Sequence, residues 1–135
     1  MSKKVSYYYH EQIGNFYYSQ NHPMKPFRIK ITDTLIEAYK LKDKMHNICP
    51  EHYEDIIESI DFTKFHSDEY VDFLQTVNPQ NLELMKEHLL YFNIGEDCPV
   101  FEGIWDYCCI YSAGSIIGSH LLSNNNSQIV INWSG

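Results

Sequence analysis

The sequence predicts an α/β fold organised around a parallel sheet. Residues 5–9 are rich in β-forming side chains and predict a first strand, and helical patterns follow. Residues 129–131 are a short continuous apolar run, typical of a strand buried on both faces of a parallel sheet. Strand, helices and a second, central strand indicate an α/β domain with few strands. At 135 residues we expect one domain, residues 1–135, whose sheet is incomplete.

The first long helix is predicted around residues 31–45. Pro26 suits the first turn of the segment, because its fixed φ fits a helix start. One stripe of apolar residues repeats at helical spacing: Ile31, Leu35, Ala38, Leu41 and Met45. Charged residues repeat on the opposite side: Lys30, Asp33, Glu37, Lys40 and Lys44. The pattern is that of an amphipathic helix.

Four further helices are predicted. A short one covers residues 54–60, and Ser67 is an expected N-cap for a helix that runs through Leu74. After the break at residues 78–79, apolar residues at helical spacing predict the next helix: Leu82, Met85, Leu89 and Phe92. The last helix is expected at residues 101–122, where Gly114 and Gly118 permit close approach of a neighbouring backbone.

Residues 92–101 form the loop around which the two halves of the chain are organised. Gly95 permits backbone angles that are closed to other residues, and Pro99 fixes φ. The neighbouring carboxylates of Glu96 and Asp97 therefore lie on a stiff loop. An acidic turn on a solvated surface is one interpretation, and a pair of acceptors for the backbone amides of a bound peptide is the other. The residue types leave both open.

Charge is distributed unevenly along the chain. The net charge is −8, with +4 in residues 1–30, −4 in residues 31–60 and −8 in residues 61–135. Nucleic acid is therefore not an expected partner, because phosphate contacts need clustered bases, whereas a basic peptide is compatible. The four cysteines form no CxxC pair, and no signal peptide or membrane span is predicted, so we expect an intracellular protein, nuclear or cytoplasmic.

Few local patterns point to catalysis. The seven histidines are scattered without metal-ligand spacing, and a nucleophile elbow, a P-loop and a dinucleotide-binding glycine pattern are absent from the sequence. Lys25 and Arg28 stand beside two prolines and form a small basic site. This site is either a structural ion pair or a binding site for an anion.

Several longer motifs occur in one order along nearly the whole chain: Tyr7-Tyr8-Tyr9, Gly14-Asn15-Phe16-Tyr17-Tyr18, His22-Pro23-Met24-Lys25-Pro26-Phe27-Arg28-Ile29, the segment of residues 65–74, the loop of residues 92–101, and Asn132-Trp133-Ser134-Gly135. Together they closely resemble the N-terminal third of class I histone deacetylases. The resemblance implies part of an arginase/deacetylase-type α/β fold, which in the family has a large parallel sheet and a zinc-dependent lysine deacetylase site.

The resemblance also implies roles for three residues. Asp97 matches the rim aspartate that holds the backbone of the acetyl-lysine substrate. Arg28 matches an arginine that lines the internal channel below the active site. Lys25 matches a lysine that helps to bind an inositol phosphate in co-repressor-bound members. Around it, residues 19–21 replace the usual glycine-containing turn.

The catalytic motifs of the family follow the tetrapeptide that residues 132–135 match. A Gly-Leu-His-His segment there holds the general base, and the Asp/His/Asp zinc ligands and a tyrosine come later. None of these motifs occurs in this sequence. We therefore expect no zinc cofactor and no deacetylase activity from this chain alone, as in a truncated, inactive relative. The alternatives are an interaction module for deacetylase or co-repressor partners, and an incomplete piece of a longer active enzyme.

Overall fold

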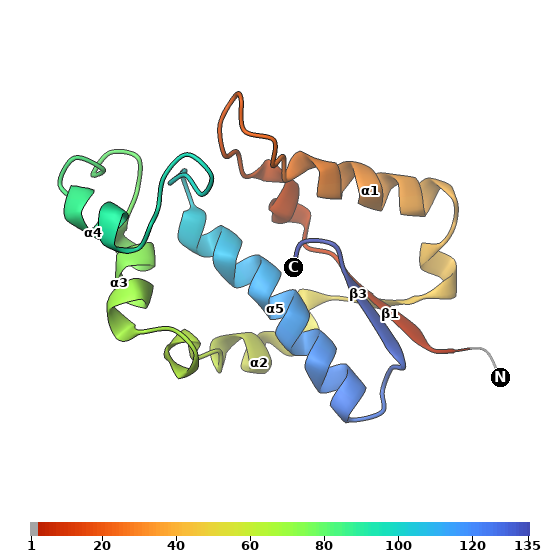
Figure 1. Cartoon of the computed structure of the whole chain (residues 1–135). Helices are drawn as coiled ribbons and strands as arrows, with labels where there is room; N and C mark the ends of the chain where they lie inside the picture. The colour runs from red at the N-terminus through yellow and green to blue at the C-terminus, as the bar shows by residue number, and fades with distance from the viewer. Residues whose placement is uncertain (1–2) are drawn as a thin grey trace.

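The computed structural model describes residues 3–135 as a three-stranded parallel sheet with helices on both faces (Figure 1). The strands are β1 (Val5–Tyr8), β2 (His46–Ile48) and β3 (Ile129–Asn132). The α-helices are α1 (Phe27–Ala38), α2 (Glu54–Glu58), α3 (Asp68–Thr76), α4 (Lys86–Tyr91) and α5 (Ile104–Ser123). The described range also contains four short 3-10 helices: η1 (Glu11–Asn15), η2 (Lys42–Lys44), η3 (Pro50–Tyr53) and η4 (Phe62–Lys64). The predicted α/β class with a small parallel sheet is confirmed.

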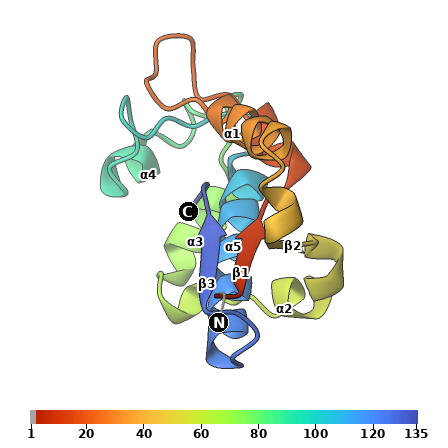
Figure 2. The ribbon, with the colours of Figure 1, turned by 90° about the vertical axis from the view of Figure 1, so that its right-hand side faces the viewer.

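The centre of the sheet is β1, with β2 and β3 on its two sides (Figure 2). Within residues 3–135, β3 lies at the edge of the sheet and pairs with β1 on one side, and Ile129 keeps 39% of its surface exposed. For the described part of the chain, the prediction of a central, fully buried strand at residues 129–131 is therefore wrong. The short apolar run is equally compatible with an edge strand, because its composition does not reveal how many neighbours it has. β2 was not predicted, because three residues are too few to show alternation.

Successive side chains of β1 point to opposite faces of the sheet and fix a helix on each. The hydroxyl of Tyr7 donates a hydrogen bond to Asp33 of α1, with an O···O distance of 3.1 Å. The hydroxyl of Tyr8 donates to the carbonyl of Ile110 in α5 at 2.8 Å. The sheet is therefore enclosed between α1 and α5, and both tyrosines are almost fully buried.

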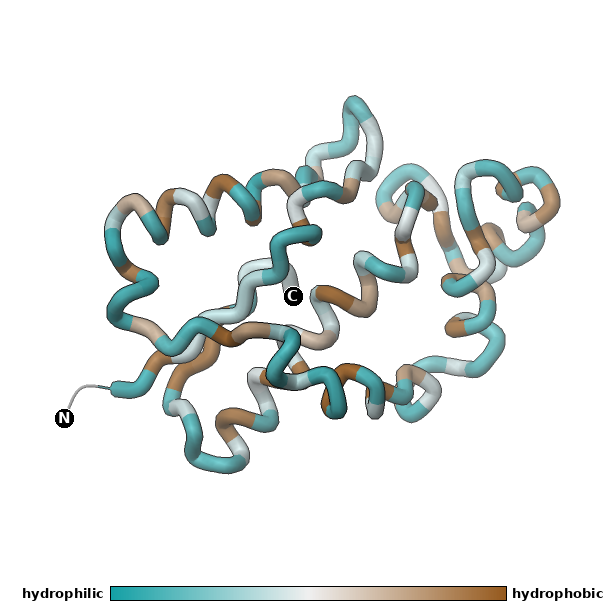
Figure 3. Tube along the Cα trace, turned by 180° about the vertical axis from the view of Figure 1, so that it is seen from behind, coloured by the Kyte–Doolittle hydropathy of each residue, from teal (hydrophilic) through white to brown (hydrophobic). Residues whose placement is uncertain are grey.

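The two predicted glycines of α5 are what let this helix lie close to the sheet. A Cβ at Gly114 would overlap the ring of Tyr8, and one at Gly118 would come within 3.0 Å of Val130. Ile117 and Leu121 on the same face are buried in the core beside Tyr8. Hydrophobic residues follow α5 along its length in Figure 3. The predicted helix is confirmed, although it begins at Ile104 rather than at residue 101, and so is the close approach at Gly114 and Gly118.

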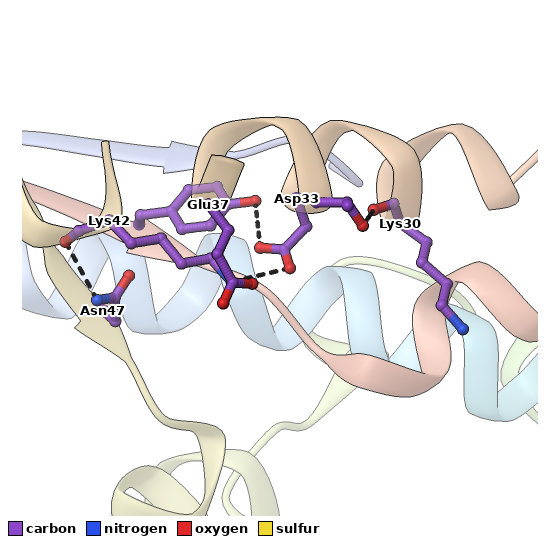
Figure 4. A network of polar contacts seen from close by, with 7 residues as sticks. Lys30, Asp33, Glu37, Lys42 and Asn47 are labelled. Carbon is purple, nitrogen blue, oxygen red and sulfur yellow. Dashed lines mark hydrogen bonds and ion pairs between the residues drawn. The ribbon is translucent and has the colours of Figure 1, made fainter. Parts of the chain in front are cut away.

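The predicted orientation of the first helix is wrong. α1 ends at Ala38, and its predicted apolar stripe faces solvent, since Ile31 and Leu35 are each 53% exposed. Asp33, from the predicted charged side, is 7% exposed and lies against the sheet. Figure 4 shows its carboxylate directed toward Lys42, whose Nζ donates to it at 2.9 Å. Two donors compensate the burial of Asp33, so this face packs inward.

α2 packs against the core beside Tyr8 and Ile48, whereas α3 and α4 lie on the side of the molecule away from the sheet (Figure 1). α2 and α3 follow the prediction, and the Ser67 hydroxyl accepts a hydrogen bond from the Tyr70 N–H as the expected N-cap. α4 is shorter than predicted, because residues 82–85 form turns rather than a helix. Within residues 3–135, every helix is too short or too polar to cross a bilayer.

Candidate functional site

Asp97 lies on the exposed loop between α4 and α5. Its carboxylate makes no hydrogen bond or ion pair with any residue of the described range 3–135, whereas its backbone carbonyl is held by His22. Nε2 of His22 lies 3.1 Å from that carbonyl oxygen, and Nδ1 accepts a hydrogen bond from the Met24 N–H at 3.0 Å. Because Nδ1 is an acceptor, the proton resides on Nε2, which donates to Asp97. The loop is fixed while the carboxylate stays free.

The conformation of this loop differs from the prediction in one respect. Gly95 does not adopt a positive φ, and nothing lies within 4 Å of a Cβ built on it. The left-handed residue is Asn93, with φ of 54°, where α4 ends. The Ile94 N–H then donates to the carbonyl of Leu89 at 2.8 Å and closes the helix end. Asparagine tolerates this backbone region better than most residues, so the turn begins two residues earlier than expected.

A cluster of four aromatic rings joins the Asp97 loop to the loop of residues 16–26. Tyr18 stacks on Phe101 with ring centroids 4.5 Å apart, and Phe16 meets Tyr107 edge to face at 5.3 Å. Gly103, with φ of 74°, allows the chain to enter α5 beside this cluster. A Cβ there would come within 2.9 Å of the Phe16 ring. The cluster therefore fixes both loops at the start of α5.

Lys25 stabilises the second of these loops. Its Nζ donates to the carbonyls of Ser19 and Gln20 at 2.6 and 2.8 Å and lies 5.2 Å from the centroid of the Tyr17 ring. The basic site is thus not an ion pair, because the ammonium group binds neutral carbonyls. Two of its three donors are already used. The assignment of Lys25 to an inositol phosphate remains a prediction from the resemblance.

Arg28 lies at the first turn of α1 and is exposed. Its Nε donates to the Lys25 carbonyl at 3.4 Å, and Nη2 lies 3.2 Å from the sulfur of Met24. Burial, and then the nearby Tyr18, raise the pKa of Tyr107 well above its usual range, while the positive charge of Arg28 opposes that rise. Arg28 therefore lies near the aromatic cluster, and its role in an internal channel remains a prediction.

The structure thus links the three predicted residues through groups that the sequence reasoning did not single out. His22 and the four aromatic rings connect the Asp97 loop to the segment that holds Lys25 and Arg28. The motif at residues 14–18 contained two of these rings, but their partners lie more than eighty residues later. Among residues 3–135, no three His, Cys, Asp or Glu side chains are placed to hold a metal ion.

Comparison with known proteins identifies the family. The family model of the histone deacetylase domain matches residues 22–135. The chain belongs to the histone deacetylase family. It is 42% identical over 133 residues to histone deacetylase clr6 of Schizosaccharomyces pombe, covering 98% of this chain and 32% of that protein. It is 46% identical over 134 residues to histone deacetylase B of Dictyostelium discoideum, covering 98% of this chain and 30% of that protein.

A human relative gives the same result. Histone deacetylase 1 of Homo sapiens is 39% identical over 133 residues, which cover 98% of this chain and 27% of that protein. The resemblance seen in the sequence motifs is therefore confirmed for the whole chain. The chain spans 27–32% of the length of these three histone deacetylases.

Proposed function

We propose that this chain is the substrate-rim part of a histone deacetylase domain, with Asp97 as the residue that holds the acetylated peptide. The free, exposed carboxylate of Asp97, on a loop fixed by His22 and the aromatic cluster, carries the proposal. A carboxylate accepts hydrogen bonds from backbone N–H groups, and such charged hydrogen bonds are stronger than neutral ones. The names of the relatives supply acetylated histone as the substrate class, and the family resemblance implies that the acetylated residue is lysine.

The second part of the proposal is that residues 1–135 do not hydrolyse acetyl-lysine by themselves. Metal-assisted amide hydrolysis needs a metal to activate water and a base to take the proton. The resemblance supports this part of the proposal, since in the resembled family both sets of residues are expected after the motif that residues 132–135 match. Asp97 and Arg28 are thus expected to position substrate and to line the channel, while catalysis needs further protein.

The test is a titration with a short acetyl-lysine peptide that has neutral flanking residues, followed by NMR. One charged hydrogen bond contributes about 1.5–3 kcal/mol, and a millimolar Kd already requires about 4 kcal/mol. We expect shift changes at the loop with a Kd of millimolar or weaker, lost in Asp97→Asn and kept in the matched control Glu96→Gln. Equal binding by wild type and Asp97→Asn would refute the role of Asp97.

Activity is measured on the same purified chain. With an acetyl-lysine peptide and added zinc, we expect no release of acetate above the blank. Turnover that a hydroxamate inhibits would contradict the second part of the proposal and leave the first part intact.

A second candidate function is an interaction module for co-repressor partners, and the orientation of α1 favours it. Ile31 and Leu35 form an exposed apolar stripe with Phe27, which is 55% exposed. We expect an Ile31→Lys, Leu35→Lys variant to lose association with a co-repressor subunit, and Glu58→Lys on α2 to keep it. Binding that survives the double substitution would exclude this face of α1 as the interface.

A further inference from the structure

A groove between α3 and α4 lies outside the site described above. It has a volume of about 450 Å³ and is lined by Glu69 of α3 and by four residues of α4 and its end: Glu87, His88, Tyr91 and Phe92. Phe92 packs against Tyr70 and Phe73, and the centroid of each of these rings lies 5.1 Å from that of Phe92. Tyr91 lies against Phe92 and remains 75% exposed. The groove thus contains one packed aromatic ring, Phe92, and one exposed ring, Tyr91.

The carboxylates of this groove are not neutralised by the protein. Residues 65–102 contain eight acidic residues and one base, so this segment carries −7 of the net charge of −8. The single base, Lys86, forms an ion pair with Glu83. Within residues 3–135, neither Glu69 nor Glu87 has an ion-pair partner. The groove is therefore a site of uncompensated negative charge beside aromatic rings.

We infer that this groove binds a lysine or arginine side chain of a basic peptide. A cation within about 6 Å of an aromatic face is attracted by the ring, and the two carboxylates attract the same charge. An apolar side chain would instead remove water from Glu69 and Glu87 without replacing it, which is unfavourable. An anionic group would be repelled. Charge complementarity therefore selects a cationic occupant.

The inference extends the proposed function by giving the sequence context of the substrate. The groove ends at Phe92, five residues before Asp97 in the same connection between α4 and α5. The inference is that the groove takes a basic residue near the acetyl-lysine of a peptide held at Asp97. The inference rests on the proposed function for the acetyl-lysine, but the groove itself binds the unacetylated basic residue.

The experiment measures binding of two fluorescent peptides by anisotropy, using the whole chain at low salt. One peptide carries two arginines beside the acetyl-lysine, and the other carries alanines at those positions. We expect the arginine peptide to bind more tightly, and Tyr91→Ala to weaken it by roughly two- to fivefold. Glu69→Gln combined with Glu87→Gln is expected to weaken it by at least about threefold. Tyr91→Phe keeps the aromatic face and should bind as wild type does.

The controls distinguish binding in the groove from general electrostatic attraction to the acidic chain and from binding at Asp97. Glu54→Gln combined with Glu58→Gln removes two exposed carboxylates from α2, outside the groove, and should change the Kd by less than about 1.5-fold. Equal weakening by this pair and the groove pair, or no effect of Tyr91→Ala, would overturn the inference. If Asp97→Asn binds the peptide as wild type does while the groove variants still weaken binding, the proposed function alone is refuted.

Discussion

Removing the hydroxyl of Tyr7 tests directly how α1 is attached to the sheet. Asp33 receives one donor on each carboxylate oxygen: the Tyr7 hydroxyl at 3.1 Å and Lys42 Nζ at 2.9 Å. Replacing Tyr7 by phenylalanine keeps the ring and removes only the first donor. Since Tyr7 is 1% exposed and Asp33 is 7% exposed, little water can take the place of the lost hydroxyl.

The expected cost follows from this burial. Hydrogen bonds to charged groups contribute about 1.5–3 kcal/mol, and a buried acceptor left without its donor loses that amount. Lys42 still neutralises Asp33, so the cost stays below the roughly 3–5 kcal/mol of a buried ion pair that loses one partner. We therefore expect Tyr7→Phe to lower the free energy of unfolding by about 1.5–3 kcal/mol.

The measurement is urea unfolding followed by tryptophan fluorescence, at a protein concentration low enough to keep the chain monomeric. Tyr17→Phe is the matched control, since Tyr17 is 58% exposed. The control should lie within about 0.5 kcal/mol of wild type. A Tyr7→Phe variant as stable as that control would mean that the buried hydrogen bond does not hold α1 in place.

Three further predictions concern packing, pH and the sheet edge. Gly114→Ala should destabilise the fold by about 1–3 kcal/mol, because the new methyl group overlaps Tyr8, while Gly95→Ala, with open space around it, serves as the control in the same denaturant titration. Burial raises the pKa of Tyr8 from 10.0 to about 12. Unfolded Tyr8 therefore ionises first, so its contribution to stability is complete below pH 10.0 and is lost as the pH rises to about 12. The slope of this loss is at most about 1.4 kcal/mol per pH unit; Tyr8→Phe should make alkaline unfolding shallower, and an unchanged pH profile would contradict this. Finally, the open edge of β3 should cause self-association at micromolar concentration in size-exclusion chromatography, and Ile129→Lys should abolish it; a wild-type chain that stays monomeric would contradict this.

The elements of the fold were predictable where a local signal sets them. Ser67 caps α3 through its own side chain. The glycines of α5 indicate a close contact in the sequence alone, although only the structure identifies Tyr8 and Val130 as the residues contacted. The inward face of α1 was not predictable in this way. Its sequence has two possible faces, and Asp33 turns inward because Tyr7 and Lys42, from elsewhere in the chain, supply its donors. A helical period shows that a helix has two sides, and tertiary contacts decide which one is buried.

The candidate site likewise contains residues that the sequence could point to and residues that it could not. The resemblance pointed to Asp97, and the exposed loop position agrees with a residue that is free to meet a ligand. The residues that fix this loop were missed. His22 contacts it across 75 positions of sequence, and Tyr18 stacks on Phe101 across a similar separation. Such contacts leave no periodic pattern, so only the three-dimensional structure identifies them.

The central place of β1 in the sheet has a consequence for how the chain folds during synthesis. β1 is made first, and β2 follows soon after it, but Gln128 at the start of the β3 pairing lies 124 residues after its contact at Lys4. Closing this longer loop costs about 1 kcal/mol more than closing the loop to β2. At ~5–20 residues per second, the ribosome needs roughly 4–16 s after it has made β2 to reach β3. Throughout that interval one edge of β1 and the ring of Tyr8 lack their native cover, so a nascent chain depends on transient shielding of its first strand until its last strand emerges.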